Sequence, residues 1–483
     1  MVELLATLPA HEHPEWCKHV CDVVDDYLRQ TASLFAGRVL YVNVWADFVG
    51  MATEMESLEE LVAHLGATYG CKVEVALYQA CESNRRSMQF VKQNWQPKHT
   101  TTDAFDRNWE EGTLVTETGE WLEMPVGKID IYVAGFPCAP WSRRGKQLGF
   151  DDKQGPACFA VCKTINKLQP AFFILENVLA VGTEEASFEV LETETVYRSI
   201  IEYFERELVN HTSVTLRGVD PTHTNFPMSK TRLFQVGQRR GVGGEGALVA
   251  CLSALISNPM PIEHNYRQFL NLPKSRVDFT RFMCLPTEGE LQALAASQCT
   301  CSLSPMEVCT LHPCRCGLCS VAEPLVCGWR AKAVKFVVSH FGGGLVDGSN
   351  LRKLTYCQVV ELSGQTLSNS PRERNLLNII ANLPRVHPLS DTLAVFDLSQ
   401  SIDRISISTN GTVPTSATNS SFICLCDGHT LNVMQIGYLM GHKMAKLDYS
   451  GISAAHLKHM LGMSFHVSSV GLCLAGILAA VGS

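Results

Sequence analysis

Short apolar stretches with strand-like composition alternate with runs of helical periodicity through the first half of this chain. The strand-like stretches cover residues 38–45, 72–78, 129–134 and 171–175. Between the first two, apolar side chains recur at helical spacing from Met55 to Leu65, and a similar run lies between Pro156 and Gln169. Repeated strand–helix–strand units predict an α/β fold with a doubly wound, mostly parallel sheet of Rossmann-like type.

The first helical run carries local signals at both ends. Thr53 and Glu56 stand three residues apart at its start, which is the spacing of a capping box, and Gly66 follows its last apolar residue. The sequence therefore predicts a helix over residues 53–66, directly after a loop over residues 47–52.

Side chains with useful chemistry follow each predicted strand. Phe48 and Gly50 follow the first strand, Glu82 the second, Cys138 the third and Glu176 the fourth. In a doubly wound sheet, ligands bind beyond the carboxyl ends of the strands. We therefore expect one site at this edge of the sheet, formed by four strand ends.

Cys138 is the candidate nucleophile of this site. It lies in the segment GFPCAPWS, residues 135–142, where Pro137 and Pro140 restrict the backbone on either side of the thiol. A cysteine that only filled a core would not need so rigid a mount. The segment therefore indicates a thiolate presented to a substrate.

Two carboxylates at the same edge have distinct possible roles. Glu82 could bind both hydroxyls of a ribose, although an acidic residue after a strand is also a common helix cap. Glu176 ends a very apolar strand, so we expect it to be partly buried with a raised pKa. An ion pair between Glu176 and an arginine is the alternative interpretation.

Composition limits the class of protein and its partners. With 483 residues, of which 46% are apolar, the chain can form two domains or one domain with a large insertion. Its formal net charge of -8 means that a local basic patch must hold any nucleic acid. Its 20 cysteines are spread along the chain, which favours reduced intracellular thiols over a disulfide framework.

Neither end of the chain predicts a membrane protein. Residues 1–10 lack the charged start and the apolar run of a signal peptide. The apolar run over residues 470–481 is too short to span a bilayer, so we expect it to form a buried final helix.

Several motifs together resemble the cytosine-5 DNA methyltransferase family. Residues 135–142 resemble its catalytic-loop motif, usually GFPCQPFS, and Glu176-Asn177-Val178 matches its Glu-Asn-Val motif. The cofactor loop, the Pro-Gln-x-Arg-x-Arg stretch and two C-terminal motifs have weaker matches at residues 47–58, 227–237, 431–441 and 462–467. The similarity spans residues 38–237 and 431–481.

The resemblance implies methylation of cytosine C5 in DNA by an S-adenosylmethionine-dependent enzyme. Cys138 would attack C6 of the base and form a covalent adduct, while Glu176 would hydrogen-bond N3 and the exocyclic amine. Arg232 would hold the base O2, with Lys230 as a weaker neighbour because it lacks the planar guanidinium fork. The target cytosine would have to be flipped out of the duplex.

The resemblance also implies a set of cofactor-binding and strand-binding residues. S-adenosylmethionine would be bound by Phe48, Gly50, Glu82, Asp103, Pro137 and Gly462. Arg143, Arg144 and Lys146 could contact phosphates of the displaced strand, although an ordinary solvated loop carries such charges as well.

Departures from the family pattern leave two alternative functions open. Ala52 and Thr53 replace glycines of the cofactor loop, whereas Met228 replaces a glutamine and Met463 an asparagine. These changes favour a catalytically weak paralogue that binds nucleic acid or a partner, but retention of Cys138 with its glutamate argues against that interpretation. Methylation of cytosine in transfer RNA, performed by a related branch with the same residues, is the second alternative.

The resemblance divides the chain into four parts. We expect an N-terminal helical extension over residues 1–37, the first part of the catalytic domain over 38–240, a smaller target-recognition lobe inserted over 241–430, and a return to the catalytic domain over 431–483.

The inserted lobe is cysteine-rich over residues 299–327. Cys316 and Cys319 form a C-x₂-C pair, and Cys314 and Cys327 could complete a tetrahedral structural zinc site. The alternative is a loop that is cysteine-rich by chance. DNA as substrate would place the protein inside the cell, and in the nucleus of a eukaryote, although no clear basic localisation run is present.

Overall fold

The computed structural model describes residues 8–9, 15–142, 145, 147–190, 195–244, 246–272, 394–400, 407–408, 410–424 and 429–482. The chain forms two compact units. The first comprises Met1–His264, Thr415–Asn419 and Asn432–Ser483, and the second comprises Asn265–Pro414 and Ser420–Leu431. The first unit holds the predicted strands.

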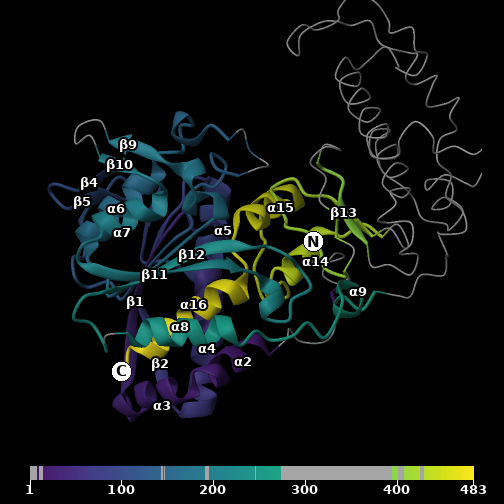
Figure 1. Cartoon of the computed structure of the whole chain (residues 1–483), viewed down its shortest axis with the longest axis horizontal. Helices are drawn as coiled ribbons and strands as arrows, with labels where there is room; N and C mark the ends of the chain where they lie inside the picture. The colour runs from purple at the N-terminus through teal and green to yellow at the C-terminus, as the bar shows by residue number, and fades with distance from the viewer. Residues whose placement is uncertain are drawn as a thin grey trace, which may run out of the picture. The chain divides into compact units, whose positions relative to one another are not determined.

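The first unit is built on a seven-stranded sheet in the order β11-β12-β8-β7-β1-β2-β3 (Figure 1). Its strands are β1 (Val39–Asp47), β2 (Lys72–Cys81), β3 (His99–Thr101), β7 (Ile131–Ala134), β8 (Phe172–Asn177), β11 (His211–Val219) and β12 (Arg232–Arg239). The strands from β3 to β8 run parallel, whereas β12 is antiparallel to both of its neighbours. This order confirms the mostly parallel, doubly wound sheet.

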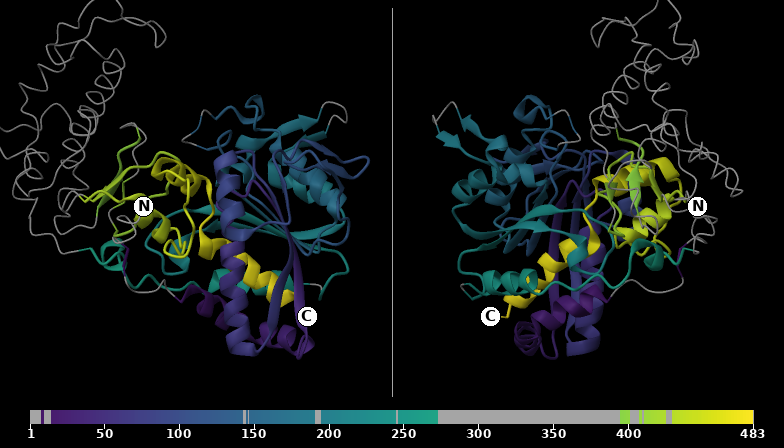
Figure 2. Two further views of the ribbon diagram at one scale, coloured as in Figure 1. Left: turned by 180° about the vertical axis from the view of Figure 1, so that it is seen from behind. Right: turned by 45° about the vertical axis from the view of Figure 1, so that its right-hand side comes forward.

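Helices cover both faces of this sheet (Figure 2). On one face lie α4 (Thr53–Tyr69), α5 (Arg85–Trp95) and α16 (Val467–Ala480), and on the other lie α6 (Ala157–Leu168) and α7 (Ile200–Glu207). Alternate strand residues, among them Trp45, Tyr132 and Phe173, share a core with the buried face of α6. Alternation of side chains along each strand thus supplies an apolar layer to both sets of helices.

The final helix α16 is a core element. All of its side chains are buried, and it packs against α4, α2 (Trp16–Val23), α3 (Asp25–Leu34) and α8 (Ala247–Ser257). In the described ranges no single helix is long and apolar enough to cross a bilayer. Only α15 (Ala454–Met463) and α16 taken together meet that test, with a 44° bend between them. The expected buried final helix is confirmed.

Helix α4 differs from its sequence prediction at both ends. Its N-cap residue, Ala52, has left-handed backbone with φ 54, and no side chain caps the helix. The predicted capping box is wrong because the Glu56 carboxylate accepts hydrogen bonds from His442 Nδ1 at 2.6 Å and from Lys443 N at 2.5 Å instead. The helix ends at Gly70, with φ 66, and not at Gly66. The helix therefore continues through Gly66, although a glycine inside a helix costs about 1 kcal/mol.

Two small sheets complete the described part of the first unit. One contains β4 (Arg107–Asn108), β5 (Thr113–Val115) and β6 (Trp121–Glu123), and the other pairs β9 (Phe188–Val190) with β10 (Thr195–Tyr197).

The second unit, where described, contains α9 (Tyr266–Phe269) and a three-stranded antiparallel sheet. Its strands are β13 (Val395–Asp397), β14 (Ile407–Ser408) and β15 (Phe422–Cys424), with β13 in the middle. Asp397 organises this sheet, since one of its carboxylate oxygens accepts a hydrogen bond from Ser421 N at 3.0 Å and the other from Ser420 Oγ at 2.7 Å.

Candidate active site

The predicted site residues lie on segments that meet at one edge of the large sheet. Phe48 follows β1, Glu82 follows β2, Asp103 follows β3 and Cys138 follows β7, while Glu176 is the penultimate residue of β8. Strand β12 runs in the opposite sense, so its first residue, Arg232, lies at the same edge. The parallel topology therefore collects these segments as the sequence predicts.

Hydrogen bonds fix the loop that carries Cys138. The Cys138 carbonyl accepts from the backbone N–H groups of Trp141 at 3.0 Å and Ser142 at 2.9 Å. Asn177 Nδ2 donates to the Phe136 carbonyl at 2.8 Å, and Asn177 Oδ1 accepts from the N–H of the next residue at 2.8 Å. The loop is thus attached to the end of β8, next to Glu176.

Opposing effects act on the Cys138 thiol, which is partly exposed. Burial of its surroundings raises the pKa of the thiol, and the negative charge of Glu176 raises it further. The positive charges of Arg232 and Lys230 lower the pKa. The two cations therefore favour the thiolate that nucleophilic attack requires.

Glu176 combines both properties that the sequence offered as alternatives. It is 9% exposed, and burial raises the pKa of its carboxyl group. Its Oε1 also accepts a hydrogen bond from Arg232 Nε at 2.9 Å, and this positive charge lowers the pKa in part. Glu176 therefore has a polar partner and a raised pKa at the same time.

Lys230 is held firmly under the same edge. It is 2% exposed, and its Nζ donates to the Ser464 carbonyl at 2.5 Å. The chain before it is organised by Asp220, which accepts from Ser229 Oγ at 3.2 Å and Thr231 Oγ1 at 2.6 Å. Lys230 is thus a fixed charge that also ties the β12 segment to the end of α15.

The cofactor-loop segment takes a tight path after β1. Phe48, Gly50 and Ala52 have φ values of 58, 54 and 54, all in the left-handed region. Glu82 braces this turn, because its Oε2 accepts from Gly50 N at 3.0 Å and its Oε1 from Asn84 N at 2.7 Å. Ala52 is fully buried, so the extra Cβ is accommodated by the core.

Space remains at this loop for a ligand. A Cβ built on Gly50 would meet no atom within 4 Å, so the backbone is open on that side. Burial raises the pKa of Glu82, and its backbone hydrogen bonds lower it. Each Glu82 oxygen accepts one backbone N–H, which leaves further acceptor capacity for hydroxyl groups.

The other predicted cofactor residues have varied surroundings. Asp103 is exposed, and its Oδ1 accepts from Phe105 N at 2.9 Å. Pro137 is half-buried directly before Cys138. Gly462 packs so closely on the backbone of Thr418 that a Cβ there would overlap it, which gives this glycine a packing reason.

The substituted methionines occupy different environments. Met228 is fully buried in the core, whereas Met463 at the end of α15 is 53% exposed. Met228 thus fills apolar space where the family motif has a polar residue.

Sequence reasoning missed a buried ion pair beneath the cofactor loop. Arg107 donates to both oxygens of Asp47, at 2.7 and 2.5 Å, and both side chains are almost completely buried. Tyr132 Oη donates to Asp47 at 2.7 Å, and Trp45 Nε1 does so at 3.0 Å. Asp47 therefore anchors the end of β1. No local signal pairs it with an arginine 60 residues away.

Two sets of predicted residues lie outside the described residues. These are the cysteines Cys314, Cys316, Cys319 and Cys327 and the basic residues Arg143, Arg144 and Lys146. The zinc site therefore stays a prediction. Within the described ranges, no group of three or more histidine, cysteine or acidic residues could hold a metal, and the cysteines are free thiols.

The fold and the site together define an α/β domain with a cysteine-bearing loop at the carboxyl edge of a mostly parallel sheet. Residues 64–240 match the family model described as C-5 cytosine-specific DNA methylase. The matched segment holds Cys138, Glu176 and Arg232, so this part of the chain is similar to that family, as the motifs predict.

Individual curated proteins are similar to this chain over part of their length. The type II methyltransferase M.NgoBI of Neisseria gonorrhoeae is 27% identical over 151 residues, which cover 29% of this chain and 44% of that protein. M.HpaII of Haemophilus parainfluenzae is 28% identical over 152 residues, which cover 29% of this chain and 40% of that protein. The chain thus spans less than half the length of these relatives.

Solved structures match over most of the chain at low identity. A putative DNA modification methyltransferase encoded within an E. coli prophage aligns with a TM-score of 0.46 and 14% identity, over 92% of this chain and 100% of that one. The DNMT2 structure from Spodoptera frugiperda aligns with a TM-score of 0.40 and 12% identity, over 90% and 99% of the two chains.

Proposed function

We propose that this protein transfers a methyl group from S-adenosylmethionine to C5 of cytosine in DNA through a covalent adduct on Cys138. The observation that carries the proposal is the group formed by Cys138, Glu176, Arg232 and Lys230. Both cations lower the pKa of the Cys138 thiol, and Arg232 hydrogen-bonds Glu176 at 2.9 Å. A nucleophile, a proton-holding carboxyl group and fixed positive charges are what addition to a pyrimidine ring needs.

In the proposed reaction, the Cys138 thiolate forms a bond to C6 of the cytosine. Electron density moves toward N3 and O2, where protonated Glu176 donates a hydrogen bond to N3 and Arg232 interacts with O2. The raised pKa of Glu176 supports this role, because it favours the protonated form of the carboxyl group. Once C5 is methylated and its proton is removed, the bond between Cys138 and C6 breaks and the thiolate returns.

The residues around the β1 loop fit the methyl donor. S-adenosylmethionine, when bound, supplies a methyl group on a positively charged sulfur. Glu82 would accept hydrogen bonds from its ribose, the open backbone at Gly50 would lie against it, and Asp103 would meet its adenine amine. Phe48, Pro137 and Gly462 complete the proposed set.

A mechanism-based trap tests the proposal. Duplex DNA carrying 5-fluorocytosine should give a covalent adduct in the presence of S-adenosylmethionine, because the fluorine blocks the final elimination. Cys138→Ala should give no adduct, and Cys473→Ala, which alters a buried cysteine far along the chain, should react normally. If the wild type forms no adduct with DNA, the proposed function is wrong.

Further arms of this experiment address the substrate and the metal. An adduct with transfer RNA and none with DNA would establish the transfer RNA reaction instead. The target base must leave the duplex to reach Cys138. Permanganate reactivity of a thymine placed at the target position can report this base flipping.

Zinc in the inserted lobe is a separate proposal, tested by metal analysis of the purified protein and of Cys316→Ser. With DNA as substrate, a eukaryotic source would place the protein in the nucleus.

A further inference from the structure

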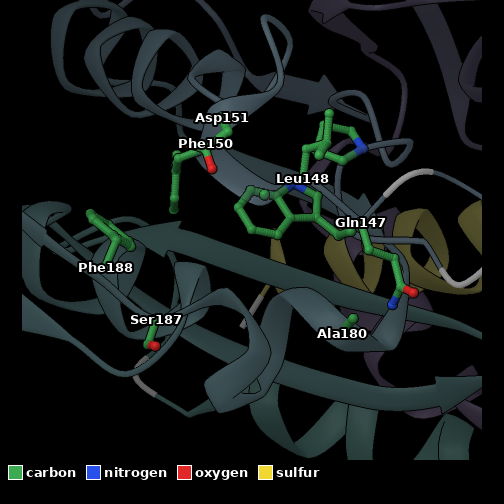
Figure 3. A pocket seen from close by; sticks show the side chains of 10 residues that line it. Gln147, Leu148, Phe150, Asp151, Ala180, Ser187 and Phe188 are labelled. Atoms are coloured by element: carbon green, nitrogen blue, oxygen red, sulfur yellow. The ribbon is translucent and has the colours of Figure 1, made fainter.

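A cavity of about 570 Å³ lies next to the proposed active site, within the first unit. One wall comes from the loop after Cys138, through Trp141, Gln147, Phe150 and Asp151, and the other from the segment after Glu176-Asn177, through Ala180 and Phe188. Figure 3 shows Phe150 and Phe188 on one side of the opening and Gln147 on the other. None of the proposed reaction steps uses this cavity.

The cavity has aromatic walls with fixed geometry. The ring of Phe150 packs edge-on against Trp141, with ring centroids 4.8 Å apart, and lies 4.7 Å from Phe188. From behind, Phe159 stacks on Phe150 at 5.4 Å with an interplanar angle of 13°. These rings support one another, so the walls are preformed surfaces for a flat ligand.

One wall residue has an unused hydrogen-bond donor. Trp141 is 5% exposed, and its indole Nε1 is buried without a hydrogen-bond partner. An unpaired buried N–H is unfavourable, so an acceptor on a ligand would gain from this position. Asp151 and Gln147 add a carboxylate and an amide at the exposed part of the lining.

The lining selects one class of ligand. Aromatic walls favour a planar ring, the indole N–H and the Gln147 amide favour ring acceptors, and the Asp151 carboxylate favours N–H donors. The same carboxylate disfavours a phosphate. A nucleobase presents both donors and acceptors on a flat ring, and a cavity of this size accommodates one.

We propose that this cavity binds an unpaired nucleobase of the DNA other than the target cytosine. The inference rests on the proposed function, because flipping one cytosine leaves its partner base without a pair and its neighbours without a stacking contact. Trp141 is three residues from Cys138, and Ala180 is four residues from Glu176. A base in the cavity would therefore bridge both loops that carry the reacting groups and hold them in place.

A thermodynamic cycle between DNA and protein tests this inference. Binding of duplexes with an abasic site at each position around the target is measured for the wild type and for Phe188→Ala. At one position, loss of the base should weaken wild-type binding about 5- to 150-fold, which corresponds to roughly 1–3 kcal/mol of base–aromatic stacking. Phe188→Ala should weaken binding of intact DNA by a similar factor and should add little for that abasic duplex.

Two further variants keep the test decisive. Trp121→Ala removes an exposed tryptophan outside the cavity, and its binding should equal that of the wild type. Ala180→Phe fills the cavity without removing a wall ring, so it should reproduce the loss even if Phe188→Ala folds poorly. Thermal melting of each variant reports its folding.

The outcomes separate this inference from the proposed function. Suppose that the wild-type protein forms the 5-fluorocytosine adduct. If the loss of binding from the abasic site and the loss from Phe188→Ala are then additive at every position, the cavity does not bind a base. If no DNA adduct forms at all, the proposed function has failed first. Equal loss for Trp121→Ala would likewise overturn the assignment to this cavity.

Discussion

At Cys138, burial and two neighbouring cations act on the same thiol in opposite directions. Burial raises the pKa above the ordinary value of 9.0, so the thiolate population should still be increasing at alkaline pH. We expect the alkylation rate of Cys138 by iodoacetamide to rise from pH 7 past pH 9. Quantitative mass spectrometry of the peptide that contains Cys138 measures this rate.

Charge variants around the thiol should move that profile in predictable directions. Glu176→Gln removes a negative charge that raises the Cys138 pKa, so its profile should shift to lower pH. Lys230→Met removes a positive charge that lowers the pKa, so its profile should shift to higher pH. Identical profiles for the three proteins would contradict the electrostatic account of this site.

Asn177, which follows Glu176, donates one hydrogen bond to the Phe136 carbonyl in the Cys138 loop and accepts another from Val178 N. Asn177→Asp keeps the oxygen that accepts from Val178 N but replaces the donor to the Phe136 carbonyl with a second acceptor. We expect a loss of about 1–3 kcal/mol in the free energy of unfolding, measured with urea, and slower adduct formation. Asn210→Asp, at an exposed turn, is the control and should change neither quantity.

Between elements, Gly135 at the end of β7 supports the Phe465 ring, which follows α15. A Cβ on Gly135 would overlap this ring and approach Glu176 Oε2 to 3.4 Å. Gly135→Ala should therefore lower the free energy of unfolding by about 1–3 kcal/mol, the usual cost of overpacking. Calorimetric or denaturant unfolding gives this value. The double variant Gly135→Ala/Phe465→Leu should recover part of the lost unfolding free energy, because the smaller side chain leaves room for the Cβ. If the effects of the two substitutions are additive instead, the contact is not the cause.

The first turn of α4 holds a buried carboxyl group with its own pH dependence. Burial raises the pKa of Glu54 from 4.5 to about 7, against hydrogen bonds that lower it, among them one from Tyr78. The folded protein therefore binds more protons than the unfolded chain between these two values, so stability falls as pH rises from 4.5 to about 7. At about 1.4 kcal/mol per pH unit, the full effect is roughly 3 kcal/mol.

Glu54→Gln should remove this contribution. The free energy of unfolding of the variant, measured with urea at several pH values, should fall less between pH 4.5 and 7 than that of the wild type. Glu120→Gln, at an exposed turn, should keep the wild-type dependence. Parallel curves for wild type and Glu54→Gln would show that the group is ionised in the folded state.

The elements could be predicted where their signals are local. Strand composition and helical periodicity located β1, β2, β7, β8 and α6, and parallel topology then brought the strand ends together. The uncapped start of α4 could not be predicted, because Glu56 bonds to His442, 386 residues further along the chain. The contact of Lys230 with Ser464 and the pairing of Asp47 with Arg107 could not be predicted either, because the partners are far apart in the sequence.

At the scale of the whole molecule, ligand binding and folding are linked through the β1 loop. Glu82 braces Gly50 and Asn84, so the loop is already shaped before a cofactor binds. A ligand that binds only the folded protein stabilises it by about 2.7 kcal/mol at a concentration of 100 times its dissociation constant. S-adenosylhomocysteine, the product form of the methyl donor, should therefore raise the melting temperature in a concentration-dependent way.

Glu82→Gln tests whether the brace is also the ribose contact. The variant lowers the melting temperature of the free protein if Glu82 only supports the loop, whereas a ribose contact predicts that the ligand-induced rise in melting temperature shrinks as well. The rise is measured against each variant's own ligand-free value, so the two effects separate. Glu205→Gln on α7, across the sheet from the loop, should show the full wild-type rise. If the wild type itself shows no rise with S-adenosylhomocysteine, the substituted loop at Ala52 does not hold the donor, and the non-catalytic interpretation of this chain gains the stronger support.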